Sequence, residues 1–147
     1  MDAPRAEGMS GTFRIIEHPS DLGIEAEAST IEEAFALAAE GLMSVIVDLP
    51  TVTPRESRRI RLPGSDDERL LVRWLGEVLH LYDGTGFVPA RFAVTGVSEE
   101  GLTAEVTGEP LDPSRHRLKL DVKAVTYHGI AVRRSAAGNS VRVYLDI

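Results

Sequence analysis

Two segments with helical periodicity, each opened by a capping box, constrain the fold of this chain more than any other feature. Thr30 followed by Glu33 is such a box, and it predicts a helix over Ile31–Val47 whose apolar residues recur at helical spacing. The segment SDDE at 65–68 has the same chemistry and predicts a second helix that ends near Tyr82. Each helix has an apolar face to bury, so the rest of the chain has to supply a partner layer.

Strand patterns surround these helices. Alternating apolar and polar residues or short apolar runs indicate strands before the first helix, between the helices and after the second one. The segments are 12–17, 21–28, part of 51–62 as an edge strand, the two arms of a hairpin around Ser98-Glu99-Glu100-Gly101, the bent stretch 118–132, and 140–147. Strand, strand, helix, strand, helix and four strands predict an α+β fold, with two amphipathic helices packed on a mostly antiparallel sheet of about seven strands.

Composition limits the class of protein. A chain of 147 residues with 43% hydrophobic side chains fits one domain, which we place at 12–147 behind a flexible N-terminal tail, 1–11. The absence of cysteine excludes disulfides and thiolate metal sites. No apolar run is long enough for a membrane span or a signal peptide, so we expect a soluble, cytoplasmic protein with no membrane partner. A net charge of -7 argues against tight, direct binding to nucleic acid and favours a basic protein surface or a cation as partner.

The stretch Gly108–Gly129 concentrates chemistry-bearing side chains. It holds the only lysines of the chain, Lys119 and Lys123, and the histidines His116 and His128. All other basic positions are arginine, which indicates a need for a compact ammonium here, unless both lysines are surface positions filled by chance. His128 and Lys123 could form a polar cluster on a bent strand, while local hydrogen bonds are expected to hold His116.

The usual catalytic signatures are missing: there is no glycine-rich phosphate loop, HExxH, GxSxG or histidine pair at helical spacing. What remains is oxygen chemistry. If the strands that carry Asp21 and Asp146 are neighbours, their carboxylates and the terminal carboxylate of Ile147 could surround one hard cation such as Ca²⁺ or Mg²⁺. The alternative is two solvated aspartates at strand ends. His18 could orient Asp21 or cap a strand end, and His80 is expected to be structural.

Four segments resemble the archease family in order and spacing, from about Phe13 to the end of the chain. They are HPSDLGIEAEASTIEEAF, LLVRWLGEVLHLYD, GEPLDPSRHRLKLDVKAVTYHG and the final YLDI. The resemblance implies a small α+β protein that is a chaperone-like cofactor of the GTP-dependent RNA-splicing ligase that joins tRNA exons. Such a protein accelerates guanylylation of the ligase histidine, allows multiple turnover and broadens nucleotide use, without ligating RNA itself.

The same resemblance assigns roles to residues. The family's first acidic metal ligand falls on Asp21 and the second on Asp146, with Ile147 contributing through the chain end. The bound ion is expected to be a divalent cation, calcium first, with magnesium or manganese as alternatives. The motif reads His-Pro-Ser-Asp where the family commonly has His-Thr-Ala-Asp, so it keeps the aspartate and changes the loop before it. The residues expected to line the same region are His18, Lys123 and His128.

Three functions follow as hypotheses. The first is a non-catalytic activator of an RNA-splicing or RNA-repair ligase, which works through an acidic metal-binding tip and is associated with tRNA only indirectly. The second is a stand-alone metal-dependent phosphoester or nucleotide hydrolase that uses the same aspartates with His128 as general base. The third is a general protein chaperone, which would need an exposed apolar patch that the sequence does not make obvious.

Overall fold

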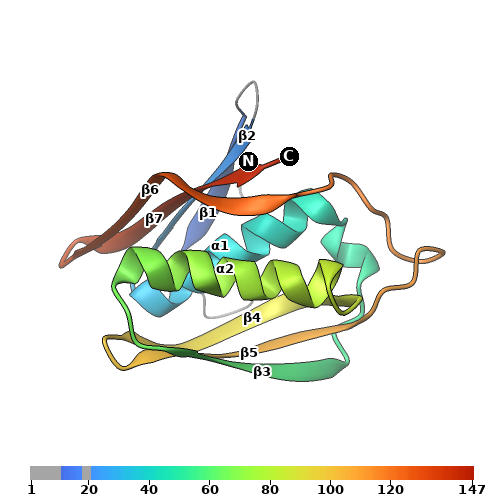
Figure 1. The fold of residues 1–147 in the computed structure, drawn as a ribbon, viewed down its shortest axis with the longest axis horizontal. Helices are drawn as coiled ribbons and strands as arrows, with labels where there is room; N and C mark the ends of the chain where they lie inside the picture. Colours follow the sequence, from blue (N-terminus) through green and yellow to red (C-terminus); the bar gives the residue numbers. More distant parts are fainter. Residues whose placement is uncertain (1–10, 18–20) are drawn as a thin grey trace.

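The computed structural model of the chain describes residues 11–17 and 21–147, which form two α-helices, one 3₁₀ turn and seven strands (Figure 1). In chain order these are β1 (Thr12–Glu17), β2 (Asp21–Ala28), α1 (Ile31–Ile46), η1 (Leu49–Thr51), β3 (Glu56–Pro63), α2 (Asp67–Asp83), β4 (Phe87–Ser98), β5 (Gly101–Pro110), β6 (Ala124–Ser135) and β7 (Gly138–Asp146). The predicted order and the α+β class are confirmed for this part of the chain. Residues 1–10 of the predicted tail lie outside the described residues, whereas Gly11 is buried.

The strands of the described chain divide into two antiparallel sheets, and the helices lie between them (Figure 1). The first sheet has the order β1-β2-β7-β6 and the second the order β3-β5-β4. α1 contacts β2 and β7 on one side and β4 on the other, and α2 contacts β6 and β4. The sequence predicts one sheet. Two are found because α1 is apolar around most of its circumference, and a helix of that kind has to be covered on more than one side.

The first helix begins at its predicted cap, whereas the cap of the second is Asp66, one residue after the Ser65 that the capping-box pattern implies. The Thr30 hydroxyl accepts a hydrogen bond from the Glu33 amide at 3.1 Å, and the Asp66 carboxylate accepts one from the Arg69 amide at 2.9 Å, so Asp66 is the cap of α2. Trp74 of α2 is fully buried, and its indole nitrogen donates to the carbonyl of Phe35 in α1 at 2.9 Å. The indole therefore fixes the contact between the two helices.

The C-terminal end of α1 is capped by a distant part of the chain. A helix leaves its last four carbonyls without partners inside the helix. Here the Val47 amide donates to the carbonyl of Met43, and the amides of Lys119 and Leu120 donate to those of Ile46 and Val45. The Lys119 ammonium donates to the remaining carbonyl, that of Ser44, at 2.7 Å. Because α1 has no basic residue in its last turn, Lys119 also supplies the positive charge that a helix C-terminus favours.

β7, the last strand, lies in the middle of the first sheet between β2 and β6. Its register with β2 runs from Asp21 opposite Asp146 to Ala28 opposite Asn139. The apolar residues Leu22, Ile24, Ala26, Val141, Val143 and Leu145 are all buried and face the helices. Strand alternation therefore places the residues between them, including both aspartates, on the outer face of the sheet.

The second sheet agrees with the predictions in outline. β3 is an edge strand, and its Arg58 guanidinium lies 4.3 Å from the centre of the Phe87 ring, so this arginine also covers apolar surface. β4 and β5 form the predicted hairpin, with Glu99 and Glu100 at the turn. β4 begins at Phe87 and bulges twice on its way to the turn.

Candidate functional site

The two predicted acidic ligands come together at one end of the first sheet. Asp21 is the first residue of β2, Asp146 is the last residue of β7, and their Cα atoms are register partners. In an antiparallel pair, directly opposed side chains share a face with Cβ atoms about 4.5–5.5 Å apart. Asp21 is half-buried and Asp146 is exposed, so the pair is open to solvent on one side. We name Asp21, Asp146 and Ile147 the acidic tip.

A third segment reaches the acidic tip from the other side of β7. Ala124, the first residue of β6, is the register partner of Asp146, and the amide of Lys123 donates to the Asp146 carbonyl at 2.8 Å. Ile147 follows at the end of the sequence and is 40% exposed. The backbone around Asp146 is therefore held on both sides, by β2 and by the start of β6.

The donor set at the tip suits a hard divalent cation. Carboxylate oxygens are the ligands that Ca²⁺ and Mg²⁺ prefer, and two like charges placed directly opposite each other destabilise a sheet unless something neutralises them. Within residues 11–17 and 21–147, no group of three or more histidine, cysteine, aspartate and glutamate side chains is placed to hold a metal. A cation at Asp21 and Asp146 therefore needs further oxygen ligands from the backbone, from Ile147 or from a partner.

The sequence model of the Archease protein family matches residues 13–147. The chain belongs to the archease family. It is 37% identical to the protein archease of Sulfurisphaera tokodaii over 137 residues, which is 92% of this chain and 98% of that protein. It is 39% identical to the protein archease of Thermococcus gammatolerans over 125 residues, 83% of this chain and 88% of the relative.

Solved structures agree with the archease assignment. The solution structure of Methanobacterium thermoautotrophicum protein 1598 superposes with a TM-score of 0.78 at 29% identity, over 92% of this chain and 98% of that one. The crystal structure of an archease from Thermotoga maritima, described there as a possible chaperone, superposes with a TM-score of 0.59 at 18% identity, over 90% of this chain and 94% of that one. The second likeness shows the fold alone.

The remaining predicted site residues of this archease chain lie near the start of β6 or outside the described residues. Lys123 directly precedes β6, and His128 lies in a bulge where residues 127–130 stand opposite the single residue Val143. This bulge confirms the bend that the sequence predicts. Both side chains are exposed, and their meeting in one polar cluster stays a prediction. His18 lies outside the described residues.

Tyr144 is a residue near the tip that the sequence interpretation missed. Its ring lies on the outer face between Gly23 of β2 and Gly129 of the β6 bulge. A Cβ atom at Gly23 would lie 2.8 Å from the ring, and one at Gly129 would lie 2.7 Å from it, so a side chain at either position would collide with the tyrosine. Gly129 also has a φ of 73°, which favours glycine. Glycines inside strand patterns signal such close approaches and could have identified this contact.

A fully buried carboxylate lies in the region that also holds His116. Glu109, next to last in β5, accepts hydrogen bonds from the Arg115 guanidinium at 2.8 Å and from the Thr53 amide at 2.7 Å, and the Arg55 guanidinium lies 3.0 Å from it. The hydrogen bonds from Arg115, the largest cause, from His116 and from the Thr53 amide hold the pKa of Glu109 at about 2. We name Glu109, Thr53, Arg55, Arg115 and His116 the buried cluster.

His116 is held by local hydrogen bonds, as predicted. Its Nδ1 lies 3.0 Å from the amide nitrogen of Asp112, and its Nε2 lies 2.8 Å from the Glu109 carboxylate. An amide can only donate, so Nδ1 has to accept, and the ring proton is therefore on Nε2, where it is donated to Glu109. This histidine is satisfied on both sides and has a structural role.

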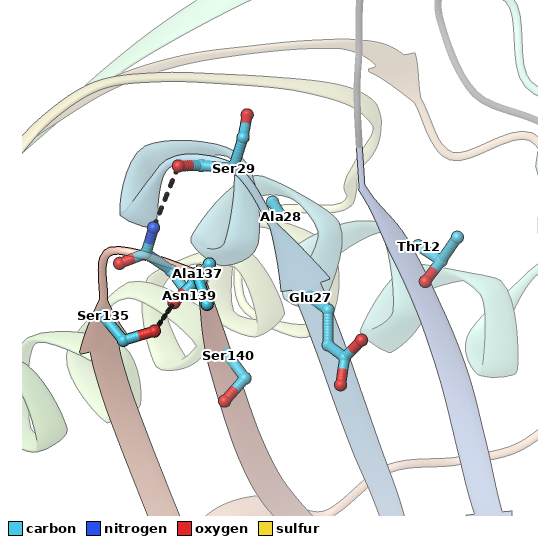
Figure 2. A pocket seen from close by; sticks show the side chains of 9 residues that line it. Thr12, Glu27, Ala28, Ser29, Ser135, Ala137, Asn139 and Ser140 are labelled. Carbon is cyan, nitrogen blue, oxygen red and sulfur yellow. Dashed lines mark hydrogen bonds between the residues drawn. The ribbon is translucent and has the colours of Figure 1, made fainter.

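The open depression shown in Figure 2 lies at the other end of the same strands. It has a volume of about 500 Å³ and is lined mainly by small polar residues of β2, β7 and the β6–β7 turn. Asn139, which lines it, donates to the carbonyl of Ser29, and the Ser135 hydroxyl donates to that of Gly138. Since Ala28 and Asn139 are at the far end of the register from Asp21 and Asp146, this depression does not adjoin the acidic tip.

Neither helix of the described chain has the length and apolarity of a membrane span.

Proposed function

We propose that this protein activates an RNA-splicing or RNA-repair ligase in the cytoplasm, promoting guanylylation and multiple turnover of that ligase without catalysing ligation itself. The proposal rests on membership of the archease family and on one observation above all, the register pairing of Asp21 with Asp146. The pairing joins the second strand of the chain to the last one, so two acids that are 125 residues apart in sequence lie side by side on one face of the sheet.

We expect the acidic tip to be the part of the protein that contacts the ligase. Both aspartates lie on the outer face of the sheet, and Asp146 is exposed, so a partner can reach the tip from that side. The net charge of -7 suits approach to a pocket that binds phosphates and is therefore basic. A divalent cation bound there, calcium first, would neutralise the two acids and offer a positive centre. Lys123 and His128, both exposed at the start of β6, would contact the ligase or its nucleotide beside that centre.

The test is a guanylylation assay with the ligase from the same organism. Asp21→Ala is expected to fold normally and to lose at least about 100-fold in stimulation, because losing a direct ligand costs no less than losing an outer partner of a metal site, which costs roughly 10–100-fold. Glu27→Gln is the matched control, because Glu27 is an exposed acid on the same face of the same strand, at its opposite end. Full stimulation by folded Asp21→Ala protein would refute the proposal.

General chaperone activity is a second candidate, favoured by one observation. Four large apolar side chains, Leu118, Leu120, Tyr127 and Ile147, are between 40% and 53% exposed, and the Thermotoga maritima relative is described as a possible chaperone. A chaperone of this kind would suppress aggregation of unrelated unfolding proteins, and replacing both leucines with serine would abolish the effect. A dedicated ligase activator would not protect unrelated proteins, so the two candidates separate in this assay.

A further inference from the structure

A single long connection leads from the buried cluster to the acidic tip. Residues 111–123, which we name the strap, leave β5 after Pro110 and enter β6 at Ala124 (Figure 1). The strap has no strand of its own and makes one isolated bridge, between Leu118 and Val47. Most of its residues are exposed, and Leu118 and Leu120 are each 45% exposed. Its position therefore depends on a few attachments.

The first attachment is the buried cluster. Glu109 lies at the end of β5, whereas Arg115 and His116 belong to the strap, and Thr53 and Arg55 belong to the loop before β3. Each carboxylate oxygen of Glu109 contacts two of these residues. Arg55 and Arg115 contact Oε1, and Thr53 and His116 contact Oε2. One carboxylate thus ties the beginning of the strap to two other segments, and removing one partner of a buried charged group is costly.

The second attachment is to the end of α1 and the residues that follow it, and the third is to β7. The Asp48 amide donates to the Arg117 carbonyl, and Lys119 and Leu120 cap α1 as described above. Val122 is buried, and the next residue, Lys123, donates its amide to the Asp146 carbonyl. Only six residues separate His116 from Lys123, and four of them, 117–120, are attached to the end of α1 and the turn after it, so a shift at the buried cluster reaches Asp146 through this short run of attachments.

We propose that Glu109 is a positioning residue for the acidic tip, which it holds in place through the strap. Glu109 does not touch the tip. It fixes Arg115 and His116, these fix the start of the strap, and the strap delivers Lys123 to the carbonyl of Asp146. The effect on ligase activation rests on the proposed function, but the mechanical coupling from Glu109 to Lys123 does not and is measured separately.

Hydrogen exchange of single amides, followed by NMR, tests the coupling without metal or ligase. In Glu109→Gln the amides of Lys119, Leu120 and Lys123 are expected to exchange at least about tenfold faster, since a hydrogen bond to a charged group is worth roughly that factor in local opening. Amides in the centre of β2 and α2 are expected to keep their protection. Equal acceleration everywhere would mean that Glu109 only stabilises the whole domain and would overturn the proposal, as would unchanged strap amides.

Arg115→Ala is the milder second variant, in case Glu109→Gln folds poorly, and Arg134→Ala is its matched control. Both arginine side chains are about equally exposed, at 43% and 44%, and each makes guanidinium bonds to carboxylates. Arg134, however, pairs with Asp67 and lies at the end of β6 far from the tip. Faster exchange of the strap amides is expected in Arg115→Ala alone. The same acceleration in Arg134→Ala would contradict a directed coupling.

Cation binding then provides a functional measurement. With CaCl₂ as the probe and titration calorimetry as the method, Glu109→Gln or Arg115→Ala is expected to weaken binding by about tenfold, the usual cost of losing an outer support of a metal site. Arg134→Ala is expected to bind as the unmodified protein does. If the unmodified protein binds no calcium, magnesium or manganese, the proposed cation site fails, while the exchange data still decide the coupling. Unweakened binding in folded Glu109→Gln would overturn the positioning role.

Discussion

The acidic tip and the buried cluster use the same chemical group in opposite ways. Glu109 is fully buried and surrounded by donors that hold its pKa at about 2, so its charge is satisfied inside the protein. Asp21 and Asp146 are register partners on the outer face at one end of the first sheet, where Asp21 is half-buried and Asp146 is exposed. The first arrangement stabilises the fold, whereas we propose that the second binds a cation or a partner. The role of a carboxylate therefore follows from the groups that surround it and not from its position in a motif.

The contrast predicts opposite effects on stability, and this is the largest difference that we expect. Glu109→Ala leaves two arginines, a histidine and an amide without their acceptor, so it is expected to lower the midpoint of thermal unfolding more than any other variant proposed here. Asp146→Asn is expected to change the free energy of unfolding by less than about 1 kcal/mol, because it removes one of two opposed like charges. Circular dichroism of both variants measures the difference. A larger loss in Asp146→Asn would break the comparison.

Added cation is expected to stabilise the protein through the tip alone. A ligand that binds only the folded state at 100 times its dissociation constant adds about 2.7 kcal/mol to the free energy of unfolding. CaCl₂ is therefore expected to raise the melting temperature of the unmodified protein and of Glu27→Gln, and to leave that of Asp21→Asn unchanged. Differential scanning calorimetry with and without EDTA measures this effect. An equal rise in Asp21→Asn would place the cation elsewhere.

Acid is expected to remove the contribution of the buried cluster. The pKa of Glu109 is about 2 in the folded protein and lies below the ordinary value of 4.5, so its contribution to stability is fully present above pH 4.5 and is lost as the pH falls towards 2. The difference in unfolding free energy between the unmodified protein and Glu109→Gln should be constant above pH 4.5 and shrink below it. Urea unfolding at several pH values measures this difference. A difference that stays constant down to pH 2.5 would show that Glu109 is not held as the carboxylate.

Replacing the two lysines is expected to cause the smallest changes in stability. The comparison separates Lys119, which caps α1, from Lys123, whose side chain is exposed. Lys119→Met removes the ammonium at the C-terminus of α1 and is expected to cost about 0.3–1 kcal/mol. Lys123→Met, at an exposed position, is expected to stay within about 0.5 kcal/mol of the unmodified protein. Chemical unfolding of both variants measures these changes. Equal losses of stability in both variants would contradict the assignment of the Lys119 side chain, and not that of Lys123, to the end of α1.

Local signals in the sequence predicted most of the elements. The capping pattern placed the start of the first helix at Thr30 and that of the second within one residue, and strand alternation predicted the hairpin and the last strand. The division into two sheets was missed, because it depends on how fully α1 is covered, which is a property of packing. The pairing of Asp21 with Asp146 was inferred through resemblance, since strand periodicity does not specify which strands become neighbours.

The roles of several residues near the site could not be predicted from the sequence, because they depend on contacts between distant parts of the chain. Lysines 119 and 123 looked alike in a motif, but one caps a helix and the other lies beside Asp146, a difference that rests on contacts with α1 and β7. Glu109 went unnoticed because a single glutamate near a strand end has no distinctive pattern, and its donors come from two other segments. Tyr144 was missed for the same reason, although Gly23 and Gly129 were visible in the sequence.

The central claim is that Asp21 and Asp146 act together as one site, and a double-mutant cycle in the ligase guanylylation assay tests it most directly. Asp21→Asn, Asp146→Asn and the double variant are compared with the unmodified protein at the same folded concentration. If the acids form one site, each single variant loses about 100-fold in stimulation and the double variant loses little more than either one. Losses that multiply in the double variant, or a single variant that stimulates normally, would contradict the claim.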